Sequence, residues 1–196
     1  MDIVTPQIES ALKSLHDAPV RHYHVWNHPL SMRTLAERYA HLITDMQSVL
    51  AMIAFHDAVY DSRRNDNEEQ SAALAREMLS GIVPPEQLDF IVAGIIATKR
   101  HLIPDGLSPG QRRDIAFLLD ADLSILGTEA AEFDAFDAAV RKEYDWVTDD
   151  EWRVGRAAVM RSFSQRQEIY LTNEFRTAYE DQARRNIARL LKALEG

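Results

Sequence analysis

A histidine and an aspartate stand side by side at the end of an apolar run near the middle of the chain. The pair is His56-Asp57, and residues 51–55 before it read Ala-Met-Ile-Ala-Phe. Burying an imidazole and a carboxylate is costly unless the two groups are paired or bind a metal ion. A ring nitrogen and a carboxylate oxygen at adjacent positions can ligate one divalent ion, so the pair is a candidate metal dyad.

Two further residues complete a candidate ligand set. His28 lies upstream of the dyad and Asp122 lies downstream of it. All-α proteins commonly hold metals with side chains from several helices of one bundle. Two alternatives stay open: His24, about one turn before His28, as the first ligand, and Asp120 as a direct or outer ligand beside Asp122.

The elements that must position these residues are predicted to be helices. Apolar residues recur at helical spacing, and Thr5-Pro6 and Asp45 are typical of helix starts. The continuous apolar run 49–55 could be a buried strand, but its length and its Ala and Met content favour a buried helix. The predicted helices cover about residues 5–16, 29–42, 46–60, 68–79, 85–99, 111–126, 128–144, 148–164 and 172–194. If the second and third are antiparallel, their short connection brings His28 close to the dyad.

The composition indicates a single globular domain, residues 1–196, because apolar residues make up 46%, charged residues 27%, and no linker or repeat interrupts the chain. A formal net charge of -9 argues against a broad nucleic-acid-binding face, which needs clustered Lys and Arg. The N-terminus has neither the basic region nor the apolar core of a signal peptide, and no stretch is apolar enough to span a membrane. A cytoplasmic protein with no membrane partner is therefore expected, and a homo-oligomer is compatible with the sequence.

The absence of cysteine restricts the metal chemistry. Without thiolates, any ion must be held by His, Asp, Glu or water. This ligand set suits Mn, Mg, Fe, Ni or Co better than a structural zinc site.

The chain resembles the HD superfamily of metal-dependent phosphohydrolases, and within it a short bacterial subgroup of predicted HD hydrolases. The resemblance covers roughly residues 20–190. The segments that carry it are Arg21-His22-Tyr23-His24 with His28, Phe55–Tyr60 around the dyad, Asp66–Ala72, Thr98-Lys99-Arg100-His101, and Leu119–Leu123. Glu143-Tyr144, Gly155-Arg156 and Ile169-Tyr170 extend it into the C-terminal half.

The resemblance implies an all-α HD-domain helical bundle with a bound divalent metal ion. His56 and Asp57 match the defining dyad, and Asp122, which follows an alanine, matches the final aspartate. His28 has the usual spacing for the first histidine. Pro29 departs from the pattern, because a β-branched residue is expected there, and this keeps His24 open as the first ligand.

Further polar residues in these segments are candidates for the chemistry. Glu68 and Glu69 are predicted as a general base or as partners of the ligands, although a solvated helix start also favours acidic residues. His101 is predicted as a proton donor or second-metal ligand, with helix capping as the alternative. Cations for a phosphate group would come from among Lys99, Arg100 and Arg21.

These residues together predict a phosphohydrolase that uses metal-activated water on a small phosphorylated metabolite, with a nucleotide as one candidate. The first alternative is a di-iron oxygenase on an HD scaffold. That class usually needs two more histidines between the dyad and the last aspartate, where this chain has only His101. The second alternative is a non-catalytic protein that senses or binds nucleotides.

Overall fold

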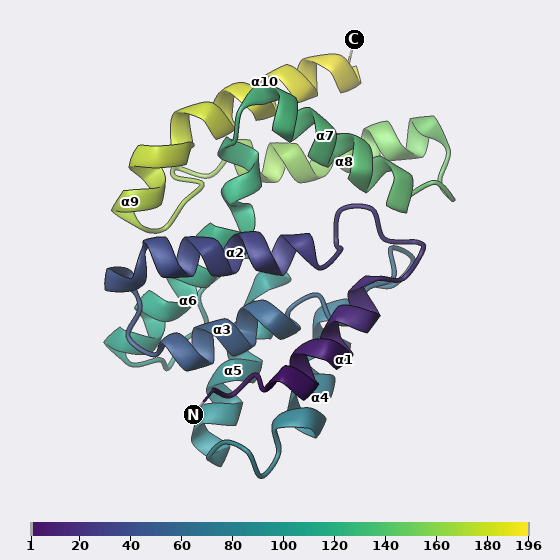
Figure 1. The fold of residues 1–196 in the computed structure, drawn as a ribbon. Coiled ribbons are helices and arrows are strands. Elements are labelled where there is room, and N and C mark those ends of the chain that lie inside the picture. Colours follow the sequence, from purple (N-terminus) through teal and green to yellow (C-terminus); the bar gives the residue numbers. More distant parts are fainter. Residues whose placement is uncertain (1, 196) are drawn as a thin grey trace. The chain divides into compact units, whose positions relative to one another are not determined.

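Helices form the fold of this protein (Figure 1). The computed structural model describes residues 2–195, and within this range there is no β-sheet. The all-α class is therefore confirmed, and none of the helices in residues 2–195 has the length and apolar character needed to cross a membrane. The α-helices are α1 (Pro6–His16), α2 (Asn27–Arg38), α3 (Met46–Phe55), α4 (Asn67–Leu79), α5 (Pro85–Thr98), α6 (Pro109–Asp122), α7 (Ala130–Glu143), α8 (Asp149–Ser164), α9 (Asn173–Phe175) and α10 (Asp181–Glu195).

Side-chain caps start several of these helices, among them α1, α3 and α8. Thr5 accepts a hydrogen bond from the backbone N–H of Ile8, and Pro6 occupies the first turn of α1. Asp45 accepts from the N–H of Ser48 at the start of α3, and Thr148 begins α8 with a full capping box. Each cap satisfies a donor that the first helical turn leaves without an intrahelical partner. The predicted starts at Thr5 and Asp45 are confirmed.

Three predicted helices change type near their ends. The second continues from α2 into a 3₁₀ turn, η1 (Ala40–Leu42), and the sixth continues from α6 into another, η2 (Leu123–Gly127). The last is interrupted by a π-helical segment, η3 (Arg176–Glu180), between α9 and α10. The third ends at Phe55 rather than near residue 60, so the His-Asp dyad lies just beyond α3.

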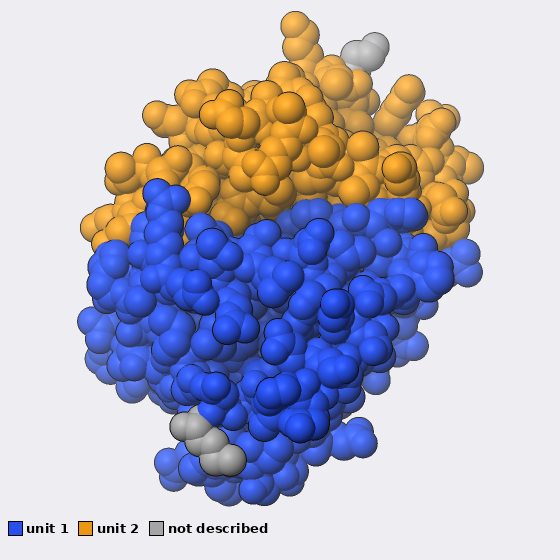
Figure 2. Space-filling view, in the orientation of Figure 1, with its two compact units in different colours: residues 1–122 blue, residues 123–196 orange. Residues whose placement is uncertain are grey.

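The chain divides into two compact units, one up to Asp122 and one from Leu123 onwards (Figure 2). Every residue predicted for the metal site or its chemistry belongs to the first unit. The single-domain assignment stays a prediction.

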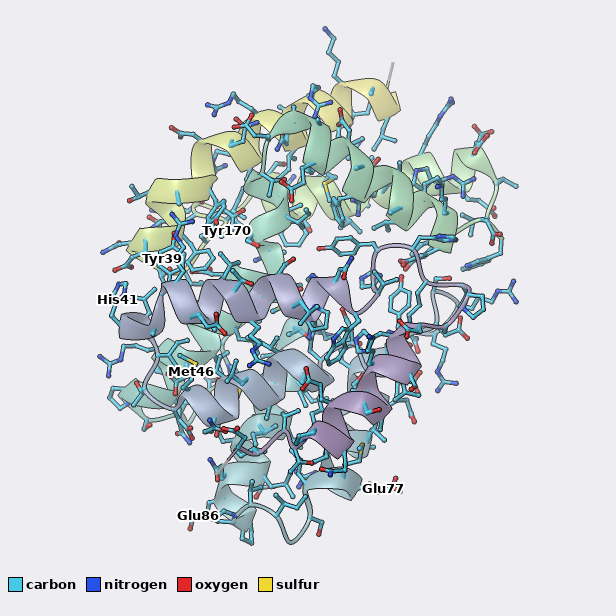
Figure 3. The ribbon with its side chains drawn as sticks, viewed as in Figure 1. Tyr39, His41, Met46, Glu77, Glu86 and Tyr170 are labelled. Carbon is cyan, nitrogen blue, oxygen red and sulfur yellow. The ribbon has the colours of Figure 1, made fainter. Side chains whose placement is uncertain are left out.

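The buried helix α3 forms the centre of the first unit. Most of its residues are buried, and it packs against α2, α5 and α6. A helix covered on several sides needs an apolar surface all round, which explains the continuous apolar run in its sequence. Figure 1 shows α2 and α3 side by side, running in opposite directions and joined through residues 39–45. The start of α2 therefore lies beside the end of α3, far from Met46, the first residue of α3 (Figure 3).

The second unit has its own core around η2. Helix α10 packs on α8 and on η2, and its Asn186 donates hydrogen bonds to the carbonyls of Leu126 and Thr128. The hydroxyl of Tyr170 donates to the carbonyl of Leu123 at 3.0 Å. These bonds satisfy polar groups that burial would otherwise leave without partners.

Candidate metal centre

Three side chains from separate parts of the chain converge on one point in the first unit. His28 lies in the first turn of α2, His56 directly follows α3, and Asp122 is the last residue of α6. One ligand atom of each lies within 4.8 Å of the others. His28 Nε2 is 3.2 Å from His56 Nε2 and 3.0 Å from Asp122 Oδ1, while His56 Nε2 is 3.7 Å from that oxygen. The predicted convergence of these three residues is present in the structure.

Asp57 extends the cluster. Its Oδ2 lies 3.1 Å from Nε2 of His56 and 3.8 Å from Nε2 of His28. It is not part of the tighter group formed by His28, His56 and Asp122. Asp57 therefore approaches the two imidazole nitrogens from the segment after α3, whereas Asp122 approaches them from the end of α6.

The spacing of these atoms fits a small divalent ion. Ligands about 2.1 Å from an octahedral ion lie about 3.0 Å apart along each edge of the octahedron. The shortest distances in the cluster, 3.0, 3.1 and 3.2 Å, are close to that edge length. Two imidazole Nε2 lone pairs that face each other at 3.2 Å repel unless a cation or a shared proton lies between them. The donor set of imidazole and carboxylate suits the metals expected from the sequence.

Backbone and tyrosine contacts orient the two imidazoles. Nδ1 of His56 lies 2.9 Å from the carbonyl oxygen of Ile53, to which it donates when Nε2 is the ligand atom. Nδ1 of His28 lies 3.2 Å from the hydroxyl of Tyr23. A hydrogen bond at the far nitrogen fixes the tautomer and the ring orientation of a metal-binding histidine. Both rings therefore present Nε2 to the cluster.

The structure favours His28 over His24 as the first ligand. The His24 ring stacks on Tyr60 with centroids 4.0 Å apart and meets Tyr23 edge-on at 5.0 Å. His24 is not a member of the ligand cluster, whereas His28 is buried within it. Asp120 is buried on α6 but is also outside the cluster, so Asp122 is the aspartate of α6 placed to bind.

The cluster is strongly coupled electrostatically. Burial alone would lower the pKa of His56, but the carboxylates of Asp57 and Asp122 raise it to about 9. Burial likewise opposes the charge of Asp57, yet His56 and the other nearby histidines hold the pKa of this carboxyl far below its usual range. Burial again opposes the charge of Asp122, whose pKa is held well below normal by hydrogen bonds from His101 and His28. Both carboxylates are thus charged at neutral pH, ready to pair with a cation.

His101 contacts the carboxylate of Asp122 at the oxygen that does not face His28. Its Nε2 lies 2.8 Å from Asp122 Oδ2, while Asp122 Oδ1 faces His28. The backbone of His101 is left-handed, with φ of 51°, where the chain turns at the end of α5. Such a conformation is uncommon for a residue other than glycine, and it is often found at functional sites. The structure brings His101 to the cluster, and its role stays a prediction.

The two predicted glutamates differ in their surroundings. Glu68 is half-buried in the first turn of α4, where burial and the nearby charge of Asp57 raise the pKa of its carboxyl. Glu69 is exposed and forms an ion pair of 2.6 Å with Lys99. Lys99 also donates to the carbonyl of Asn65 at 2.5 Å. Lys99 and Glu69 therefore tie the end of α5 to the start of α4, and of the two glutamates Glu68 is electrostatically coupled to the cluster.

Arg21 has a different role from the phosphate contact considered for it. It is buried, and its guanidinium donates to the backbone carbonyls of Asp57 and Ala58. The sequence does not distinguish a cation that points inward from one that faces a substrate.

Two contributors to the site were not assigned a role from the sequence, Tyr23 and the carbonyl of Ile53. His16, which lies outside the cluster, was not assigned a role either. His16 is fully buried, its Nδ1 bonds the carbonyl of Leu12, and burial lowers its pKa to about 4. A signal for His16 was available, because it follows the apolar residues Ile8 and Leu12 at helical spacing.

A pocket elsewhere in the first unit does not contain the cluster. It has a volume of about 190 Å³ and lies among residues of the N-terminal segment, α1, α2 and α3, including Trp26, Leu30 and Leu50. Pro29 and Ile53 line it, but the clustered ligands do not. The cluster is therefore identified by its ligand geometry and not by a cavity.

Comparison of the chain with models of protein families, with curated proteins and with solved structures finds no match. The interpretation of the site therefore depends on its own geometry and on the pattern in the sequence.

Proposed function

We propose that this protein is a metal-dependent phosphohydrolase of the HD type that acts on a small phosphorylated metabolite. The observation that carries the proposal is the convergence of His28, His56 and Asp122, with Asp57 beside them, from three separate parts of the chain. A salt-bridged cluster without a metal is the simplest alternative. The ligand atoms lie 3.0 to 3.2 Å apart, close to the edge length of an octahedron around a divalent ion, and this spacing favours the metal site.

In this proposal His28, His56, Asp57 and Asp122 hold a divalent ion from among Mn, Mg, Fe, Ni and Co. When bound, such an ion lowers the pKa of a bound water and polarises a phosphoryl oxygen. The two carboxylates offset the positive charge of the ion, and the two imidazoles leave room in the coordination sphere for water and substrate.

Glu68 and His101 are proposed as the proton-transfer groups. The raised pKa of Glu68 suits a base that accepts the proton of the attacking water as its oxygen forms the new bond to phosphorus. His101, held by Asp122 through Nε2, passes a proton to the oxygen that leaves phosphorus. Lys99 and Glu69 hold α4 against the end of α5, where Glu68 and His101 lie.

A nucleotide is one candidate substrate, and a cytoplasmic location and a homo-oligomeric state belong to the same proposal. The acidic balance of the sequence disfavours a nucleic-acid partner, and the motif pattern supports a phosphorylated substrate.

The test is a hydrolysis screen on metal-free protein reloaded separately with Mn, Mg, Co, Ni and Fe. The substrates are nucleotides, sugar phosphates and phosphodiesters, and the product measured is free phosphate or the released alcohol. His56→Ala is the control, because it removes a ligand that the proposal requires. We expect metal-dependent turnover by the wild type and none by the control. Stoichiometric metal without hydrolysis of any class would contradict the proposal and favour an oxygenase or a sensor.

A further inference from the structure

The buried residue Arg21 connects the two parts of the chain that carry the candidate histidine ligands, His28 and His56. Nη1 of Arg21 donates to the carbonyl oxygen of Asp57 at 2.7 Å and to that of His24 at 3.1 Å, and Nη2 donates to the carbonyl oxygen of Ala58 at 2.9 Å. His24 belongs to the segment that leads to His28, and Asp57 and Ala58 belong to the dyad segment. One guanidinium thus bonds to both segments.

These bonds satisfy carbonyl groups of the segment that directly follows helix α3. Helix α3 ends at Phe55, so no further helical turn follows to donate backbone N–H groups to the carbonyls beyond it. The carbonyl of Ile53 accepts from His56 Nδ1, and that of Phe55 accepts from the N–H of Ala58. Arg21 supplies the donors for the carbonyls of Asp57 and Ala58. A cation beside a helix C-terminus is also favoured by the helix dipole.

A second contact between the same segments involves aromatic rings. The guanidinium carbon of Arg21 lies 5.6 Å from the centre of the Tyr60 ring, and that ring stacks on His24 at 4.0 Å. The exposed fraction of Arg21 is only 6%, so its bonds are protected from competition by water. This arrangement leaves the guanidinium facing the backbone of the site instead of a substrate.

We infer that Arg21 is a positioning residue for the metal site, which sets the separation between His28 and the His56-Asp57 dyad. The inference depends on the proposed function, because it assumes that these residues bind a metal. Arginine is needed because its planar group presents donors in a fixed fork, whereas the ammonium of lysine is a compact point charge. A lysine at position 21 cannot reproduce all of the bonds to the two segments.

The test compares Co²⁺ binding by the wild type, Arg21→Lys and Arg21→Ala, using calorimetry for affinity and the visible absorption of Co²⁺ for ligand geometry. Arg156→Ala is the matched control. Arg156 is also buried, donates to Asp137 at 2.7 Å and lies against aromatic rings, but it belongs to the second unit. Its loss should lower the melting temperature without altering the Co²⁺ spectrum.

We expect Arg21→Ala to weaken Co²⁺ binding about 10–100-fold, as is typical for residues that orient metal ligands, and Arg21→Lys to weaken it at least about 3-fold with a changed spectrum. If Arg21→Ala does not fold, Arg21→Lys decides. Wild-type affinity and spectrum in folded Arg21→Lys would overturn the inference while leaving the metal site intact. Failure of the wild type itself to bind Co²⁺ would overturn the proposed function together with the inference.

Discussion

Replacing His16 by leucine should remove a defined part of the acid sensitivity of this protein. His16 is fully buried and its Nε2 has no hydrogen-bond partner among residues 2–195, so protonation would bury an uncompensated charge. Burial lowers its pKa from 6.5 to about 4. Between these values the unfolded chain binds a proton that the folded chain does not, so the free energy of unfolding falls as the pH is lowered through this window. From pH 7 to pH 5 the loss amounts to about 2 kcal/mol.

The assay is urea unfolding of metal-free wild type and His16→Leu, followed by circular dichroism at pH 7 and pH 5. Other titrating groups are common to both proteins, so the difference between the two free energies of unfolding isolates His16. Leucine fills a similar volume beside Trp26, whose ring lies 5.2 Å from that of His16. We expect the difference to shift by about 2 kcal/mol in favour of the variant at pH 5. A difference that is equal at both pH values would refute the assignment of His16 as a buried neutral group.

Asp57→Ala should abolish metal binding, measured by metal analysis, whereas Asp120→Ala should weaken it only about 10–100-fold, and equal losses would show that the two aspartates are ranked wrongly. Once a substrate is known, His101→Ala should lower turnover about 10²–10⁴-fold with metal content and melting temperature unchanged, and lost stability with normal turnover would instead indicate a structural role. Lys99→Ala breaks a partly exposed ion pair and should lower the free energy of unfolding by about 1 kcal/mol or less, but a large fall in turnover would place Lys99 on the substrate. Thr148→Ala should cost about 1 kcal/mol by removing the capping box of α8, and Thr148→Ser should restore most of it.

The helices were predictable because their local signals agree with their surroundings. The caps at Thr5 and Asp45 and the apolar run of α3 each predict an element that tertiary packing then favours. The end of α3 was not predictable: the sequence predicts a helix up to about residue 60, whereas α3 ends at Phe55. The carbonyl of Ile53 in its last turn accepts from the imidazole of His56, and the carbonyls just beyond the helix accept from Arg21. Arg21 lies far away in the sequence, so this partner leaves no local signal.

The convergence of the candidate ligands was largely predictable, but the contacts of the residues around them were not. His28, the dyad and Asp122 have residue types and an order that point to one site. Lys99 and Arg21 both read as cations for a phosphate, yet one is paired with a glutamate and the other bonds to the backbone. The direction in which a long side chain points depends on tertiary contacts, and the spacing of residues in the sequence does not encode these contacts.

The most direct test of the central claim is a crystal of the protein grown with Mn²⁺ and measured for anomalous scattering at the manganese edge. The metal-site interpretation predicts one strong peak about 2.0–2.3 Å from His28 Nε2, His56 Nε2 and an oxygen of Asp122, with Asp57 as the fourth ligand. The peak should be absent from crystals of His56→Ala. A wild-type crystal with Mn²⁺ in excess and no peak among these side chains would contradict the claim.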